Sequence, residues 1–203
     1  MKVLHINSSV LGEGSHSQAL AQEFITHLES GQQINLTQRN LAQQPIGDIS
    51  ADHLAAFSAE NPTPEQAALN QQSLNLINEI KQADVLLIGL PMYNFTVPSQ
   101  FKQWMDQVAR AGVSFQYTAN GAEGLLENKP VYVLASRGGF YAGTENDTQT
   151  PLIKQFFAML GITNVHFIYA EGLNISPEQQ QQSLAEARKK LANISQQLTT
   201  AAA

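Results

Sequence analysis

The stretch Val85-Leu-Leu-Ile-Gly-Leu-Pro-Met-Tyr-Asn-Phe95 contains the clearest structural signal in this chain. It begins as an unbroken apolar run, which is typical of a strand buried on both faces of a parallel sheet. Pro91 ends the run, and large flat and polar side chains follow it directly. Ligands of open α/β sheets bind at the carboxyl ends of the strands. The segment therefore indicates a flat organic ligand that lies over a strand end.

The composition favours one domain over residues 1–203 and limits the kinds of partner. The net charge is −6, and the single basic cluster, Arg188–Lys190, falls on an expected helix, so no nucleic-acid partner is expected. No stretch approaches the ~20 apolar residues of a membrane span, and the N-terminus does not resemble a signal peptide. Cysteine is absent, which excludes thiolate metal ligands and agrees with a cytoplasmic location; no metal site is expected.

Strand-like and helix-like segments alternate along the chain. Strands are expected at residues 2–6, 33–36, 85–90, 131–135 and 165–170. Helices are expected at residues 15–28, 63–81, 98–112 and 149–160 and from 176 onward, with a shorter one near 51–59. Between the helix at 98–112 and the fourth strand, Ala119-Asn-Gly121 predicts an inserted β-hairpin with strands at residues 113–118 and 124–126. This order predicts an α/β fold with one doubly wound, five-stranded parallel sheet in the flavodoxin-like order 2-1-3-4-5.

In that strand order the loops after the first, third and fourth strands meet at one edge of the sheet. The first of them, Asn7–Ser17, contains four serines and two glycines, and its last serine is expected to open a helix. Free N–H groups and the positive dipole end of a helix suit a phosphate. His16 either donates to that phosphate or faces water, and the plain alternative for the loop is an ordinary serine cap. The loop matches neither the dinucleotide fingerprint nor the P-loop.

The other two loops suit a flat ring. In Met92–Phe95, backbone groups can bind the polar edge of a ring while Met92 and Phe95 pack on it, although core packing remains an alternative for these two side chains. In Ser136–Gly139, two adjacent glycines allow close approach of the backbone, and Arg137 could place positive charge near a reduced, anionic ring. The alternative is a plain glycine turn with a solvated Arg137. A phosphate site beside two ring-contacting loops describes FMN.

Several motifs together resemble the FMN-dependent NADH azoreductase and quinone reductase family of bacteria. They are Pro91–Phe95, Val108–Gly112, Ser136–Gly139, the serines of the first loop and Phe115-x-Tyr117-Thr-x-Asn-Gly121. The resemblance implies a flavodoxin-like homodimer with FMN at each of two sites. By motif, Ser9, Ser15, His16 and Ser17 would hold the phosphate, and Met92, Tyr93, Asn94, Phe95, Ser136, Arg137, Gly138 and Gly139 would line the ring.

The same resemblance implies a substrate pocket and a reaction. Tyr117 would reach over the flavin of the partner subunit, and Met159 stands where relatives often carry an aromatic residue. The implied activity is an FMN-dependent NAD(P)H oxidoreductase that reduces quinones and azo compounds by two-electron, ping-pong hydride transfer. No side chain need act as acid or base, so no catalytic residue is predicted. The alternatives are a flavodoxin-like electron carrier and a flavin-free binding domain, and the choice between NADH and NADPH stays open.

Overall fold

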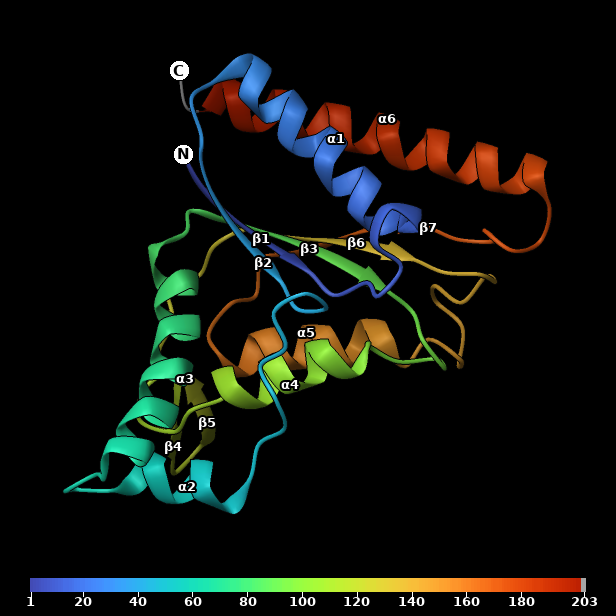
Figure 1. The fold of residues 1–203 in the computed structure, drawn as a ribbon. Coiled ribbons are helices and arrows are strands. Elements are labelled where there is room, and N and C mark those ends of the chain that lie inside the picture. Colours follow the sequence, from blue (N-terminus) through green and yellow to red (C-terminus); the bar gives the residue numbers. More distant parts are fainter. Residues whose placement is uncertain (202–203) are drawn as a thin grey trace.

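The computed structural model describes residues 1–201, and its centre is a five-stranded parallel sheet (Figure 1). The strands are β1 (Lys2–Asn7), β2 (Asn35–Asn40), β3 (Val85–Pro91), β6 (Val131–Ser136) and β7 (Val165–Ala170). They lie in the order β2-β1-β3-β6-β7, and every neighbouring pair is parallel. Counted among the strands of this sheet alone, the order is 2-1-3-4-5, because β4 and β5 belong to a separate hairpin.

Helices cover both faces of the sheet and bury two separate apolar clusters (Figure 1). On one face lie α1 (His16–Gly31) and α6 (Pro177–Ala201). On the other lie α3 (Pro64–Gln82), α4 (Ser99–Val108) and α5 (Gln149–Met159). Two short helices, η1 (Gly12–Gly14) and α2 (Ala51–Ser58), complete the fold. No helix among the described residues is long and apolar enough to cross a membrane.

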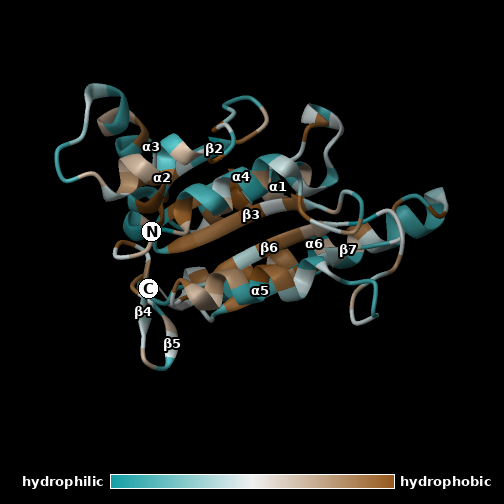
Figure 2. Ribbon diagram, turned by 90° about the horizontal axis from the view of Figure 1, so that it is seen from below, coloured by the Kyte–Doolittle hydropathy of each residue, from teal (hydrophilic) through white to brown (hydrophobic). Residues whose placement is uncertain are grey.

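The segment that dominates the sequence forms the central strand. Every residue of β3 is buried, and its side chains alternate between the two clusters, with Leu86 and Ile88 on one face and Val85 and Leu87 on the other. Figure 2 shows β3 and β6 as the most continuously apolar strands. A strand covered by helices on both faces needs apolar side chains on both, which is why alternation is missing from the sequence.

Two expected elements differ from the structure. The second strand was expected at residues 33–36 but runs over Asn35–Asn40, whose sequence is mostly polar. β2 lies at the edge of the sheet and pairs only with β1, so its side chains are half exposed and an apolar pattern is not required. α4 ends at Val108 and not at Gly112, because the chain turns at residues 110–115, where Ser114 and Phe115 bond to the Arg110 carbonyl.

The predicted hairpin is present as β4 (Phe115–Thr118) and β5 (Gly121–Gly124), so its second strand begins three residues earlier than the expected 124–126. It lies against the end of α5, and the backbones are so close that a Cβ on Gly124 would lie 1.9 Å from the Gly161 nitrogen. In Figure 1 the hairpin is remote from the carboxyl ends of the sheet strands. Tyr117 on this hairpin is 78% exposed. The hairpin therefore presents an aromatic side chain to the surroundings of the molecule and not to the sheet edge of its own chain.

Candidate functional site

The three loops selected from the sequence do meet at the carboxyl edge of the sheet. After β1, the backbone N–H and the hydroxyl of Ser8 both donate to the Gly89 carbonyl of β3, at 3.2 and 2.8 Å. After β3, the Met92 N–H donates to the Ser136 carbonyl of β6 at 2.9 Å. The loops are thus joined by hydrogen bonds, and the predicted meeting point is confirmed.

The serine loop ends in a helix start whose first donors are unused. Ser15 is the N-cap of α1 and accepts from the Gln18 N–H at 3.2 Å, so the helix opens two residues before the last serine of the loop, Ser17. The hydroxyls of Ser15 and Ser17 lie 3.2 Å apart. Within residues 1–201, the backbone N–H groups of His16 and Ser17 donate to no acceptor. Two free helix N–H groups between serine hydroxyls form an anion-binding arrangement.

Gly89 allows this helix start to lie close over the sheet. A Cβ at Gly89 would be 3.6 Å from both the carbonyl oxygen and the Oγ of Ser17, so α1 begins in van der Waals contact with β3. Asn7 fixes the loop before the helix by accepting from the Ser9 N–H at 3.2 Å and donating to Gln18 at 3.0 Å. The single glycine in the apolar run of β3 is the sequence signal for this close approach.

Residues 91–96 form a tight turn with strained backbone. Tyr93 and Thr96 exchange both backbone hydrogen bonds at 3.0 Å. The two residues between them have positive φ, 49° at Asn94 and 65° at Phe95. Two positive φ values identify a turn that favours Asn-Gly, so asparagine fits and phenylalanine does not. Such conformations cost about 1–3 kcal/mol each and persist where surrounding structure enforces them.

The side chains of this turn face the loop surface or the serine loop. Phe95 is 52% exposed and touches Tyr141 edge-on at 5.6 Å between ring centroids, so core packing does not explain it. Tyr93 reaches the first loop, where its hydroxyl lies 3.4 Å from the Ser9 Oγ and accepts from the Val10 N–H at 3.3 Å. Met92, which precedes Tyr93, is half-buried. The turn thus connects the serine loop, through Tyr93, with the exposed ring of Phe95.

The glycines after β6 also lie close to side chains of other loop residues. A Cβ on Gly138 would lie 2.6 Å from Nδ2 of Asn174, and a Cβ on Gly139 would lie 2.8 Å from the Tyr141 hydroxyl. Both glycines therefore lie close to the ends of neighbouring side chains. Their carbonyls accept from the loop after β7, whereas the N–H groups of Gly138 and Gly139 donate to nothing within the described residues. Ser136, the last residue of β6, is buried.

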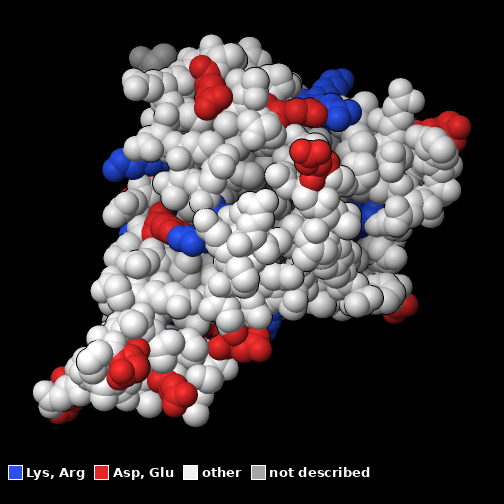
Figure 3. Space-filling view, in the orientation of Figure 1, with Lys and Arg blue, Asp and Glu red and all other residues white. Residues whose placement is uncertain are grey.

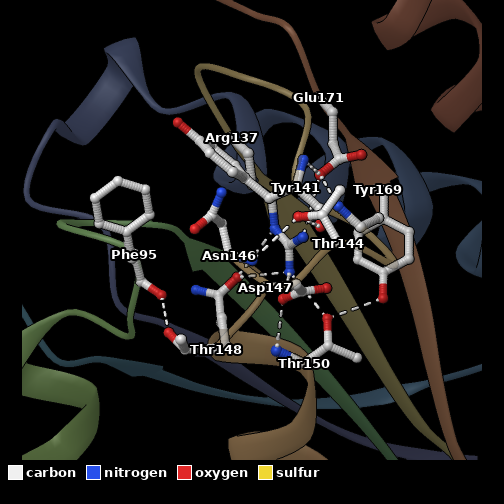
Figure 4. A network of polar contacts seen from close by, with 12 residues as sticks. Phe95, Arg137, Tyr141, Thr144, Asn146, Asp147, Thr148, Thr150, Tyr169 and Glu171 are labelled. Carbon is white, nitrogen blue, oxygen red and sulfur yellow. Dashed lines mark hydrogen bonds and ion pairs between the residues drawn. The ribbon is translucent and has the colours of Figure 1, made fainter.

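The structure corrects the interpretation of Arg137. Its side chain is fully buried and bonds to Asp147 at 3.0 Å, to Glu171 at 3.1 Å and to Thr150 at 3.0 Å (Figure 4). Two carboxylates face one guanidinium, so no positive charge is left for a ligand. Burial, the largest influence, raises the pKa of Asp147, but hydrogen bonds from Thr150 and Arg137 outweigh it and lower the pKa. The prediction that Arg137 places charge near a ring is wrong, and its role is structural.

Neither predicted substrate residue lies near these loops in the same chain. Met159 is half-buried at the far end of α5, where it lines an apolar hollow with Met105, Leu152, Phe156 and Ala122 of the hairpin. Tyr117 lies on the hairpin beside that end of the helix (Figure 1). Sequence reasoning also missed Asn174 and Tyr141. The loop after β7 lies at the same edge of the sheet as the other three loops, and the predicted strand order alone could have identified it as part of the site.

The surface around these elements carries scattered charges. In the view of Figure 3, basic side chains are dispersed among acidic ones and form no continuous patch. The donors that remain unused at the sheet edge are therefore mostly neutral backbone N–H groups. Such an arrangement can hold a phosphate at one end and the polar edge of a ring at the other.

Known proteins agree with this architecture over nearly the whole chain. The protein-family model described as a flavodoxin-like fold matches residues 1–194 of the chain. An FMN-dependent NADH:quinone oxidoreductase of Alcanivorax borkumensis is 50% identical over 94% of this chain and 98% of its own length. A protein of the same name from Pseudoalteromonas atlantica is 44% identical over 95% of this chain and 96% of its own.

Solved structures agree on the fold. An FMN-dependent NADH-azoreductase from Bacillus anthracis, solved with FMN, superposes with a TM-score of 0.88 at 24% identity, covering 98% of this chain and 99% of its own. An azoreductase from another strain of that species gives a TM-score of 0.87 at 22% identity, over 96% and 98% of the two chains. From the fold, the site and the close relatives, the chain belongs to the family of FMN-dependent NADH:quinone oxidoreductases.

Proposed function

We propose that this chain binds FMN at the carboxyl edge of its sheet and is an NADH-dependent reductase of quinones and azo compounds. The observation that carries the proposal is the set of unused backbone donors in three joined loops, at α1, at the 91–96 turn and after β6. When bound, FMN supplies the two-electron hydride chemistry that links a nicotinamide donor to the acceptor. The names of the close relatives support the same donor and acceptor.

The serine loop would hold the phosphate. The N–H groups of His16 and Ser17 and the hydroxyls of Ser9, Ser15 and Ser17 are neutral donors at the positive end of a helix dipole. The His16 ring lies 3.4 Å from the amide nitrogen of Gln180, which keeps it beside the helix start. A doubly negative phosphate is held there mainly by dipoles.

The 91–96 turn and the loop after β6 would hold the ring. The free N–H groups of Asn94, Phe95, Gly138 and Gly139 suit its polar edge, and the exposed Phe95 and half-buried Met92 suit its apolar part. Tyr93 joins this end of the site to the phosphate end through Ser9. These residues bind and orient the cofactor, and proton transfer by a side chain is not required.

A second copy of the chain would complete the substrate pocket. The exposed Tyr117 and the apolar hollow at Met159 lie at the hairpin end of the molecule, and in a homodimer they would face the loops of the partner. Each protomer would act as one domain over residues 1–203, in the cytoplasm, without a metal. Sedimentation tests the dimer, and a fully active monomer would disprove it.

The proposed function is tested by spectra and turnover of the purified protein. We expect a flavin absorbance spectrum, removal of FMN on unfolding, and NADH oxidation that a small quinone accelerates. An electron carrier would bind FMN but would not turn over with NADH and a small quinone. A colourless protein that fails to take up added FMN would refute the proposal.

A further inference from the structure

Gln149 is a buried amide that sequence analysis gave no reason to select. It is the first residue of α5 and has no exposed surface. Its Oε1 accepts from Nε and Nη2 of Arg137 at 3.4 and 3.3 Å. Its Nε2 donates to the Pro91 carbonyl at 3.0 Å and to the Thr96 carbonyl at 3.3 Å. These two carbonyls stand on either side of Met92–Phe95, so one side chain closes the base of the turn.

Arg137 determines which way this amide points. A guanidinium only donates hydrogen bonds, so the amide oxygen must face it and the amide nitrogen must face the carbonyls of the turn. Asp147 and Glu171 in turn fix the guanidinium on its other side, as Figure 4 shows for Arg137 and both acids. The amide therefore has one satisfied orientation, and in that orientation it holds the turn.

Thr148 adds a second contact from the same helix start. Its hydroxyl donates to the carbonyl of Phe95, the residue with the larger positive φ outside glycine (Figure 4). The first turn of α5 thus binds carbonyls of Pro91, Phe95 and Thr96. An unfavourable backbone conformation persists only where neighbouring groups enforce it, and these are the neighbouring groups.

We propose that Gln149, assisted by Thr148, is a positioning residue that keeps the 91–96 turn in its left-handed conformation before the cofactor arrives. The identity of the cofactor rests on the proposed function. If the turn relaxes without Gln149, only a minor fraction of the apo-protein can bind, and the apparent affinity falls by that fraction. The residue acts through the turn and does not touch the ligand.

The test is Gln149→Glu, which keeps the shape and still accepts from Arg137, but its carboxylate can donate to neither carbonyl. In the apo-protein, the Tyr93 and Thr96 N–H groups are protected by their mutual hydrogen bonds, and hydrogen exchange reports them. We expect faster exchange there, and FMN binding weakened by up to about 30-fold, as two ordinary hydrogen bonds are lost. Gln181→Glu, on an exposed position of α6, adds the same charge and should leave both readouts at the parent values.

Thr148→Val provides a second variant, because Thr148 is exposed and its loss should not prevent folding. We expect weaker FMN binding by about fivefold and faster exchange at Thr96. Unchanged exchange at Tyr93 and Thr96 in both variants would overturn the proposal, as would unchanged FMN affinity despite faster exchange. If Gln149→Glu does not fold, Thr148→Val alone decides. A parent protein that does not bind FMN would instead refute the proposed function, while exchange in the apo-protein still tests the role of Gln149.

Discussion

Replacing Arg137 by methionine should destabilise the protein strongly, because the change leaves the buried Asp147 and the partly buried Glu171 without their cation. The side chains of Asp147 and Glu171 are 5% and 14% exposed. Removing one partner of a buried ion pair typically costs about 3–5 kcal/mol, whereas a surface pair contributes about 0–1 kcal/mol. For a chain of this length, each kcal/mol lowers the melting temperature by about 2–4 °C, so a decrease of roughly 6–20 °C is expected.

The dependence on pH separates this explanation from a simple packing defect. In the parent, the net pKa shift of Asp147 is downward, so its contribution to stability is present above the ordinary value of 3.8 and is lost only below it. Without Arg137, its hydrogen bond and its charge no longer lower the pKa of Asp147, so that pKa should rise relative to the parent. The loss of stability caused by the substitution should therefore become smaller as the pH falls toward the ordinary pKa of 3.8.

Thermal and denaturant unfolding of the apo-proteins between about pH 4 and pH 8 provide the measurement. Arg188→Met is the matched control, because it breaks an exposed pair with Glu23 at 2.8 Å and should change stability by about 0.5 kcal/mol or less. A difference between Arg137→Met and the parent below about 1 kcal/mol, or one that stays constant with pH, would contradict the reasoning.

Three further predictions follow from local geometry. Burial lowers the pKa of His5 from 6.5 to about 4, so the free energy of unfolding should fall by about 2 kcal/mol from pH 7 to pH 5. In denaturant titrations at the two pH values, His5→Leu should remove this loss. Phe95→Asn should raise the stability of the apo-protein by up to about 1 kcal/mol, because asparagine tolerates positive φ. The same change should weaken FMN binding through the lost aromatic contact, and an unchanged FMN affinity would contradict this role of Phe95. Gly124→Ala should separate the hairpin from α5 at a cost of about 1–3 kcal/mol. It should also abolish the proposed homodimer while FMN binding persists, as measured by sedimentation and flavin titration.

The parts of the fold that depend on periodic burial could be predicted from the sequence. The apolar run of β3 and the stripe of α1 each give a local pattern, and both elements formed close to where they were expected. The hairpin signalled by Asn120-Gly121 also formed, but its second strand lies at Gly121–Gly124 and not at residues 124–126. β2 was misplaced because an edge strand needs no apolar alternation. The bounds of β2 therefore depend on its pairing with β1, which no local sequence pattern indicates.

The site was predictable only in part, for a similar reason. Strand order brings three loops together, and that much follows from the alternation of elements. The environment of Arg137 depends on Asp147 and Glu171, whose positions beside it are set by a loop and by the end of β7. Close approach of a ligand to the glycines after β6 stays a prediction, and the positions of Asn174 and Tyr141 beside them could not be read from the sequence. In both places part of the surroundings comes from the segment after β7, at Glu171 and Asn174, which is distant in the sequence and which no local pattern shows.

The unused donors at the sheet edge have a consequence for how this protein can change. Six of them are main-chain N–H groups, at His16, Ser17, Asn94, Phe95, Gly138 and Gly139. Any residue except proline supplies the same group at the same place. Single substitutions at these positions would therefore alter the shape of the proposed cofactor site without removing these donors, and only a change in the path of the chain would remove them. Acceptor preference is then free to diverge through exposed side chains, while cofactor retention is inherited with the fold.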